Sequence, residues 1–169
     1  WKRRLVHVLM FTMTIGPGWG TAWAQTPIAD PRAPLAWRPS VSANAGVPLV
    51  HITAPNAAGV SINQYQRFDV PTQGVVLNNS LIGGTALLGA QVPANPHLTG
   101  GRTAATIVNE VTTTGSPGVL DGTVEVFGSP ASVIVANPNG VTCNGCGVVN
   151  TPRLTLSAGS IRLLDSQGQ

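Results

Sequence analysis

The two cysteines, Cys143 and Cys146, stand three positions apart and are the residues whose spacing most directly suggests chemistry. Such a pair can form a disulfide, act as a redox couple or supply half of a zinc site. A redox pair belongs at a helix N-terminus, and the Asn-Gly step between the cysteines does not begin a helix. Zinc takes four ligands, and the further candidates, His51 and His97, are remote in the sequence. Positions i and i+3 of a β-turn lie within about 7 Å, so a disulfide is favoured over the other two readings.

Nucleophilic and phosphate-binding chemistry has little support in the residue pattern. His51, Asp69 and the serines could be assembled into a triad, but the chain has no Gly-x-Ser-x-Gly elbow. No lysine follows Lys2, which excludes a lysine-containing phosphate loop. Glu110 and Glu125 lie in predicted strands and are interpreted as solvated or paired side chains. We therefore predict no catalytic residue, no cofactor and no metal.

The first twenty-four residues have the pattern of a secretory signal peptide. Three basic residues at positions 2–4 precede the apolar run 5–15, a Gly-Pro-Gly break and the small-residue site Ala22-Trp23-Ala24. A membrane anchor is the alternative, but about 20 apolar residues are needed to span a bilayer. We expect residues 1–24 to be removed and the rest to reach the periplasm, and then the surface or exterior, of a Gram-negative bacterium. Thiols become oxidised in that compartment.

Charge after residue 24 is balanced and dispersed. The six remaining cations and the six acids give a net charge of zero, and no lysine is among them. The cations are scattered singly: Arg32, Arg38, Arg67, Arg102, Arg153 and Arg162. Nucleic-acid and anionic-lipid surfaces need clustered cations, so the charge pattern disfavours both classes of partner. No later segment is expected to span a membrane.

Short β-strands are the elements that must position these residues. Runs rich in Val, Ile, Leu and Thr alternate with Gly, Pro and Asn turns and predict an all-β class, with no sustained helical period. Residues 25–46, rich in proline, are expected to be an extended leader. A sandwich and a β-solenoid both fit the strand spacing. The expected strands are Val47–Ile52, Val75–Leu77, Thr106–Val111, Thr123–Phe127, Ser132–Val135, Leu154–Leu156 and Ile161–Leu164.

One continuous stretch and several segments before it form an ordered series of motifs. Residues 133–156 read Val-Ile-Val-Ala-Asn-Pro-Asn-Gly-Val-Thr-Cys-Asn-Gly-Cys-Gly-Val-Val-Asn-Thr-Pro-Arg-Leu-Thr-Leu. The earlier segments are Val60–Val70, Gly74–Ser80, Ile107–Val111 and Leu120–Val126. The series covers roughly Val47 to Ser160 and resembles the secretion domain of the filamentous haemagglutinin family. These are large exoproteins of two-partner secretion and include adhesins, haemolysins and contact-dependent growth-inhibition toxins.

The resemblance implies a right-handed parallel β-helix with N-terminal capping strands, which we place at residues 47–169. It implies a non-catalytic secretion module, recognised by the periplasmic domains of an outer-membrane transporter and nucleating β-helix folding during export. An adhesin head that binds cell-surface glycans or proteins of a host or neighbouring cell is the alternative. The chain ends soon after a predicted strand without a capping sequence, so we expect it to be truncated at its C-terminus.

The same resemblance selects candidate functional residues. Asn137, Pro138, Asn139 and Gly140 have the chemistry of a type I turn and are similar to a motif linked in this family with secretion competence. We expect the turn either to contact the transporter or to shape the neighbouring coils. Further family-motif positions are Asn63, Asn78, Asn79, Asn109 and Glu110.

Overall fold

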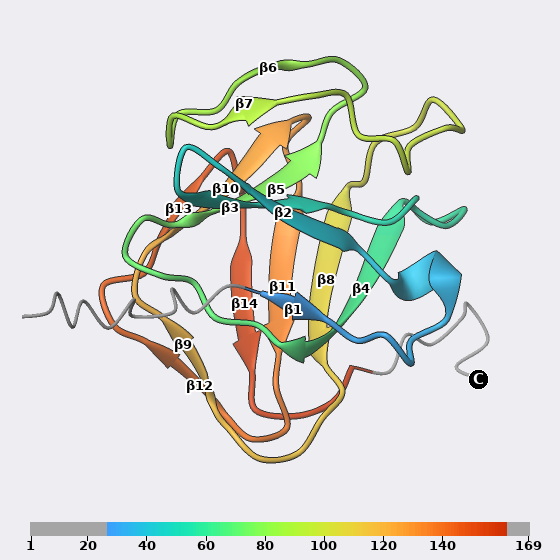
Figure 1. Ribbon diagram of the computed structural model, residues 1–169. Helices are drawn as coiled ribbons and strands as arrows, with labels where there is room; N and C mark the ends of the chain where they lie inside the picture. The colour runs from blue at the N-terminus through green and yellow to red at the C-terminus, as the bar shows by residue number, and fades with distance from the viewer. Residues whose placement is uncertain (1–26, 162–169) are drawn as a thin grey trace, which may run out of the picture.

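The strands of the computed structural model, which describes residues 27–161, stack on three faces of a coil (Figure 1). Parallel strands form the first face, in the order β4 (Val60–Arg67), β8 (Thr106–Val111), β11 (Ser132–Ala136) and β14 (Leu154–Ser157). The parallel strands of the second face are β3 (Val47–His51), β5 (Val75–Asn79), β10 (Thr123–Gly128) and β13 (Gly147–Val149). The third face pairs β9 (Gly118–Leu120) with β12 (Val141–Cys143).

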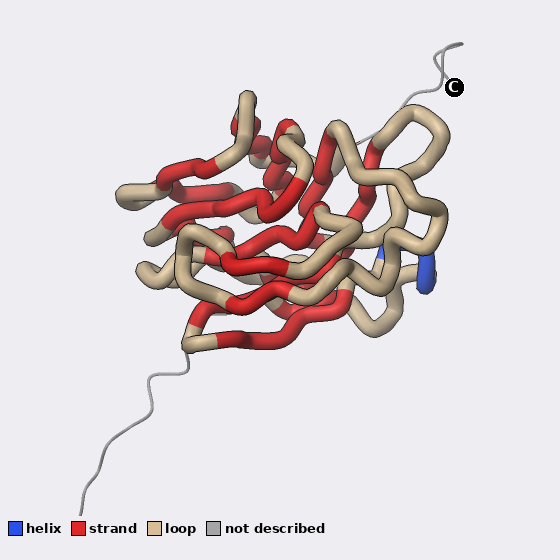
Figure 2. The backbone as a smooth tube through the Cα atoms, turned by 90° about the horizontal axis from the view of Figure 1, so that it is seen from above, coloured by secondary structure: helices blue, strands red, loops and turns tan. Residues whose placement is uncertain are grey.

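The chain visits the first, third and second faces in turn, so that each coil lies on the one before it. Figure 2 shows these strands as layers seen from above, with loops at the corners. The fold is therefore a right-handed parallel β-helix, as the family resemblance implies. The parallel pairing of strands far apart in sequence decides the choice between a sandwich and a solenoid in favour of the solenoid.

Two short strands cap the N-terminal end of the coil. Strand β1 (Ile28–Ala29) pairs antiparallel with β4, and β2 (Ser40–Asn44) pairs antiparallel with β3. The 3-10 helix η1 (Leu35–Trp37) connects them. Residues 25–46 were expected to be an extended leader, with the β-helix beginning at residue 47. Within the described part of that segment, residues 28–29 and 40–44 are strands that pair with the edges of β4 and β3 and satisfy backbone groups there.

Side-chain alternation fills the interior of the coil. Val75 and Leu77 of β5 point inward and are fully buried, while Val76 between them belongs to a second cluster outside the coil. The interior cluster is mainly aliphatic, with Tyr65 and Phe68 packed edge to face at 4.9 Å between ring centroids. Burial of this apolar surface is the main favourable contribution to folding.

A hairpin covers the outer side of the second face. Its strands are β6 (Gly84–Thr85) and β7 (Gln91–Val92), and both lie above β5 and β10 in Figure 1. Ala86, Ala90 and Val92 pack there against Val76 and Leu49. The second face is thus buried on both sides, which explains why β5 has no exposed residue.

Six of the seven expected strands lie within one or two residues of observed ones, but β4 and the strands β1, β2, β6, β7, β9, β12 and β13 were not among those expected. The longest strand missed is β4. Its inward residues include Ser61 and Asn63, so the usual apolar signal is absent from the buried side. The strand expected at residues 161–164 is not present at Ile161, and its other residues lie outside the described part of the chain. The predicted signal peptide, residues 1–24, also lies outside it.

Candidate functional site

The turn at residues 137–140 joins the first face to the third. Asn137 follows the end of β11, and the Gly140 backbone N–H donates to the Asn137 carbonyl oxygen at 2.9 Å, as a tight four-residue turn requires. Gly140 has φ of +101°, a conformation that residues with a Cβ rarely adopt. The predicted turn is therefore present, closed by its own backbone hydrogen bond.

The asparagine side chains of this turn bind the preceding coil. Asn137 Oδ1 accepts from the Asn139 backbone N–H at 2.9 Å, and Asn137 Nδ2 donates to the Ser116 carbonyl at 3.2 Å. Asn139 Nδ2 donates to the Thr113 carbonyl at 2.9 Å, and its Oδ1 accepts from the Gly115 N–H at 3.0 Å. The side-chain oxygen and nitrogen of both asparagines are thus used within the chain.

Exposure differs sharply along the same turn. Asn137 is only 2% exposed, whereas Pro138 lies on the surface and Asn139 and Gly140 are half-buried. Gly118 of the preceding coil passes so close that a Cβ there would meet Asn137 Nδ2 at 3.3 Å. The polar groups of the turn therefore face inward and hold two coils in register, and Pro138 is the part most open to a partner.

The next corner carries the disulfide. Cys143 and Cys146 are joined with their Cα atoms 5.2 Å apart, which agrees with the expected disulfide. Between them, Asn144 donates through its backbone N–H to the Leu120 carbonyl at 2.9 Å and through Nδ2 to Asp121 Oδ1 at 3.0 Å. The bridge thus closes a corner that is also bonded to the coil before it.

The remaining family-motif asparagines are spread through the coil. Asn63 and Asn109 are paired neighbours inside β4 and β8. Asn63 accepts from the Thr53 N–H at 2.9 Å and donates to the Val108 carbonyl at 3.2 Å, and Asn109 Oδ1 accepts from the Tyr65 hydroxyl at 2.9 Å. They form a polar layer between the first two coils of this face.

Asn78 and Asn79 end the buried strand β5. Asn79 Nδ2 donates to the Ala104 and Ser129 carbonyls at 2.8 and 2.9 Å, and its Oδ1 accepts from the Ala104 N–H. Asn78 Nδ2 donates to the Pro93 carbonyl at 2.8 Å. Both side chains thus satisfy the backbone of loops, and neither lies beside the turn at residues 137–140.

Glu125 is a buried acid whose role the sequence did not reveal. It is 3% exposed, and its two carboxylate oxygens accept from the backbone N–H groups of Leu87 and Leu88 at 2.7 and 2.8 Å. The carboxylate thereby anchors the turn of the β6–β7 hairpin to β10. The sequence offered one signal of this residue's position. In the alternating strand Thr-Val-Glu-Val, Glu125 lies on the side that faces away from the coil interior, where a side chain is usually solvated.

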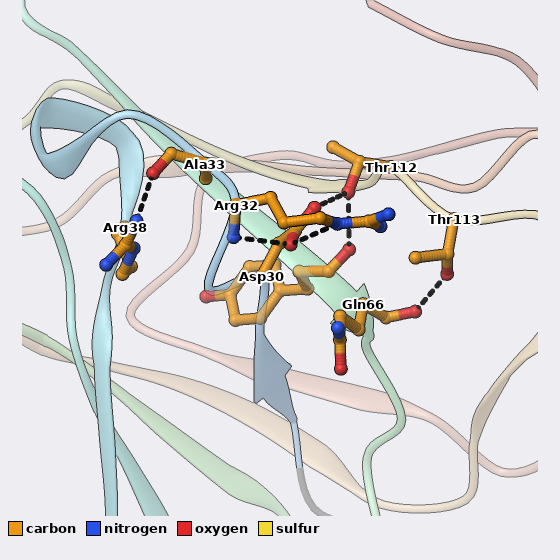
Figure 3. Close-up of polar contacts among 8 residues, drawn as sticks. Asp30, Arg32, Ala33, Arg38, Gln66, Thr112 and Thr113 are labelled. Carbon is orange, nitrogen blue, oxygen red and sulfur yellow. Dashed lines mark hydrogen bonds and ion pairs between the residues drawn. The ribbon is translucent and has the colours of Figure 1, made fainter.

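Asp30 ties the N-terminal cap to the coil (Figure 3). Its carboxylate accepts from the Thr112 hydroxyl at 2.6 Å, from the Arg32 backbone N–H at 2.9 Å and from Arg32 Nε at 3.3 Å. The Thr112 hydrogen bond, followed by the contacts with Arg32, holds the pKa of Asp30 below its ordinary value of 3.8. Asp69, also fully buried, pairs with Arg67 and accepts from the Val119 N–H at 2.8 Å.

Two histidines lie beside the capping strands. His51 Nδ1 contacts Asn78 Nδ2 at 3.0 Å, and His97 Nε2 contacts the Ser40 hydroxyl at 3.2 Å. Burial lowers the pKa of both imidazoles, and each is held by a neutral partner. Within residues 27–161 no three His, Cys, Asp or Glu side chains gather as metal ligands would, and no helix there is long and apolar enough to cross a membrane.

Comparison with known proteins gives a consistent set of relatives. Residues 28–169 match the family model described as TPS secretion domain. The chain is 40% identical to "Toxin CdiA" of Yersinia pestis over 171 residues, covering 98% of this chain and 5% of that protein. It is 48% identical to "Filamentous hemagglutinin" of Bordetella pertussis over 113 residues, covering 67% of this chain and 3% of that protein. It is 47% identical to "Hemolysin" of Serratia marcescens over 123 residues, covering 72% of this chain and 8% of that protein.

A solved structure shares the fold. The crystal structure of the filamentous hemagglutinin secretion domain superposes with a TM-score of 0.73 at 40% identity, covering 82% of this chain and 44% of that one. The chain spans less than a tenth of the length of the three curated relatives named above.

Proposed function

The chain belongs to the family of TPS secretion domains, and on this premise we propose that it is a non-catalytic secretion module of a large exoprotein. Its partner is an outer-membrane two-partner secretion transporter, which recognises it through periplasmic domains. The family match over residues 28–169 is the observation that carries the proposal. Catalytic or toxic activity of the whole exoprotein is assigned to regions beyond this module.

The asymmetry of the coil supports a role in starting β-helix folding. Strands β1 and β2 close the N-terminal end, whereas β14, β12 and β13 each have one paired neighbour within the described residues. An open strand edge offers unpaired N–H and C=O groups to the next strand. Chain that follows this module can therefore pair onto three preformed edges as it is exported.

The turn at residues 137–140 is assigned to coil stacking rather than to direct contact with the transporter. The support is the inward engagement of Asn137 and Asn139, set against the exposed ring of Pro138. Removing either asparagine side chain breaks its hydrogen bonds to the backbone of residues 113–116, each of which contributes about 0.5–1.5 kcal/mol. Export then depends on the turn because folding of the module depends on it.

The experiment compares three alanine variants expressed with the cognate transporter. Asn137→Ala and Asn139→Ala are expected to lower both the unfolding temperature of the purified chain and the amount exported. Pro138→Ala is the matched control on the exposed part of the turn and is expected to change export little. Export that is lost with Pro138→Ala, or with the asparagine variants at unchanged stability, would show that the turn is read by the transporter.

Export through the periplasm to the cell surface or medium is part of the same proposal, with residues 1–24 as the cleaved signal peptide. Mass spectrometry of the exported chain is expected to find Gln25 at its N-terminus. An exported chain that retains residues 1–24 would contradict the assignment of the signal peptide.

A further inference from the structure

His51 stands where the N-terminal cap joins the coil. Its strand β3 lies between β2 of the cap and β5 of the coil (Figure 1). Ser40 is the partner of His51 in β2, and Asn78 is its partner in β5. The Ser40 hydroxyl also contacts His97 Nε2 at 3.2 Å, so the loop after the β6–β7 hairpin reaches the same place. Ser40 thus links two histidines that come from separate elements.

The side-chain amide of Asn78 has only one orientation that satisfies its neighbours. Asn78 Nδ2 donates to the Pro93 carbonyl at 2.8 Å, and Asn78 Oδ1 accepts from the Ser80 backbone N–H at 3.1 Å. Exchanging the two ends of the amide would set its oxygen against a carbonyl and its NH₂ group against an N–H. The same NH₂ group lies 3.0 Å from His51 Nδ1. A hydrogen-bond donor is therefore fixed opposite this ring nitrogen.

This arrangement requires the neutral form of His51. Neutral imidazole has one nitrogen that donates and one that accepts, whereas both nitrogens of imidazolium donate. Because Nδ1 faces a fixed donor, it has to be the acceptor, and the proton of the neutral ring lies on Nε2. Protonation of Nδ1 places an N–H group against the Asn78 NH₂ group and breaks the hydrogen bond between them.

No acidic side chain on the neighbouring elements balances a positive charge on His51. Strands β2 and β5, the β6–β7 hairpin and residues 52–55 contain no titratable side chain, and His97 is the one in the segment 93–99. The nearest cations along the chain, Arg38 and Arg102, donate to the carbonyls of Ala33 and Asn56. Burial, and then the charge of His97, lower the pKa of His51, and burial lowers the pKa of His97.

The loop beside the two histidines is attached to the coil around Asn78. The Asn95 backbone N–H donates to the Ser80 carbonyl at 2.9 Å, and Asn95 Nδ2 donates to the Ile52 and Asn78 carbonyls at 2.9 and 2.8 Å. The Asn78 amide adds the bond to Pro93, and His97 carries the attachment on to β2. Displacing the Asn78 side chain therefore weakens the hold on residues 93–97 and on the nearby end of β2.

We propose that His51 and Asn78 form a proton-controlled joint between the N-terminal cap and the first coil. With His51 neutral, the joint is closed, and residues 93–97 and the Ser40 end of β2 are held on the coil. With His51 protonated, the Asn78 donor loses its acceptor and the two histidines come to carry like charges. This end of the cap then loosens, so the cap is held most firmly at and above neutral pH.

Nuclear magnetic resonance of the histidine rings tests the joint directly. In the full chain with His7→Gln, His51 and His97 are the remaining histidines, and His97→Gln separates their signals. We expect the neutral His51 ring to carry its proton on Nε2 and a titration to give His51 a pKa below the ordinary 6.5. A proton on Nδ1 of the neutral ring, or a pKa at or above 6.5, would overturn the proposal.

Amide hydrogen exchange, expressed as protection relative to an unstructured chain, shows what protonation does to the structure. Protection at Ser80 and Asn95 is expected to fall by up to about tenfold for each pH unit below 6.5 until His51 is fully protonated, because one proton separates the closed and open forms. Protection at Asn139, in the turn at residues 137–140, is expected to stay constant. Constant protection at Ser80 and Asn95 while His51 titrates would contradict the joint.

His51→Gln is the matched variant, because glutamine stays neutral and offers an acceptor oxygen toward Asn78. It is expected to remove the fall in protection between pH 7 and pH 5, whereas His97→Gln, which removes only the like charge, is expected to reduce it. Circular dichroism verifies that each variant is folded. The same pH dependence in the parent and in folded His51→Gln would refute the proposal, and the ring titration of the parent decides the matter if His51→Gln does not fold.

Discussion

Replacing Glu125 tests how the outer hairpin is held on the coil. The carboxylate is buried and accepts two backbone hydrogen bonds from the hairpin turn, at 2.7 and 2.8 Å. Glu125→Gln keeps the shape of the side chain but leaves one acceptor oxygen and places an NH₂ group against the second backbone N–H. Glu125→Ala removes both acceptors and leaves the N–H groups of Leu87 and Leu88 without their present partners.

The expected cost follows from these two bonds. A hydrogen bond to a charged group contributes about 1.5–3 kcal/mol, so Glu125→Gln is expected to lower the free energy of unfolding by about 2 kcal/mol. Glu125→Ala loses both bonds and is expected to lower it by about 4 kcal/mol. The loss is local at first, because the hairpin packs on the coil through the small cluster around Val76 and Val92.

Urea denaturation gives the total effect, and amide hydrogen exchange locates it. Faster exchange is expected at Leu87 and Leu88 in the Gln variant, with little change at Val133 in the interior. Glu110→Gln is the control, because that carboxylate lies outside the hairpin. A Gln variant with parental stability and parental exchange at both amides would refute the reasoning.

Three further expectations concern the disulfide, the cap and one close backbone approach. Cys143→Ser/Cys146→Ser is expected to lower the free energy of unfolding by about 2 kcal/mol, as closing so short a loop predicts, which denaturation with and without reductant checks. The depressed pKa of Asp30 contributes stability above pH 3.8 that is lost as pH falls through the folded-state pKa, so Asp30→Asn should flatten the acid side of the stability profile in pH-dependent denaturation. Gly122→Ala would place a Cβ against the Pro71 carbonyl oxygen, and thermal unfolding should show a loss of more than about 2 kcal/mol.

Much of the strand content could be read from local pattern. The segments at 106–111, 123–127 and 132–135 are rich in β-branched residues and end at turn residues, and the structure places β8, β10 and β11 there. The turn at 137–140 and the disulfide were also predicted, because both depend on residues within four positions of one another. Local sterics decide such features before any distant contact is made.

The sequence by itself therefore determined the strand class, the tight turns, the cysteine pairing and, through its motif series, the family. Tertiary structure alone decided that Asn63 and Asn109 face the interior, that residues 28–44 cap the coil, and that Glu125 anchors a hairpin formed almost forty positions earlier. The physical reason is that a buried polar group depends on the backbone or side-chain group that satisfies it. In a β-helix that partner lies one coil away, at a distance along the chain that loops and insertions set and that local pattern does not encode.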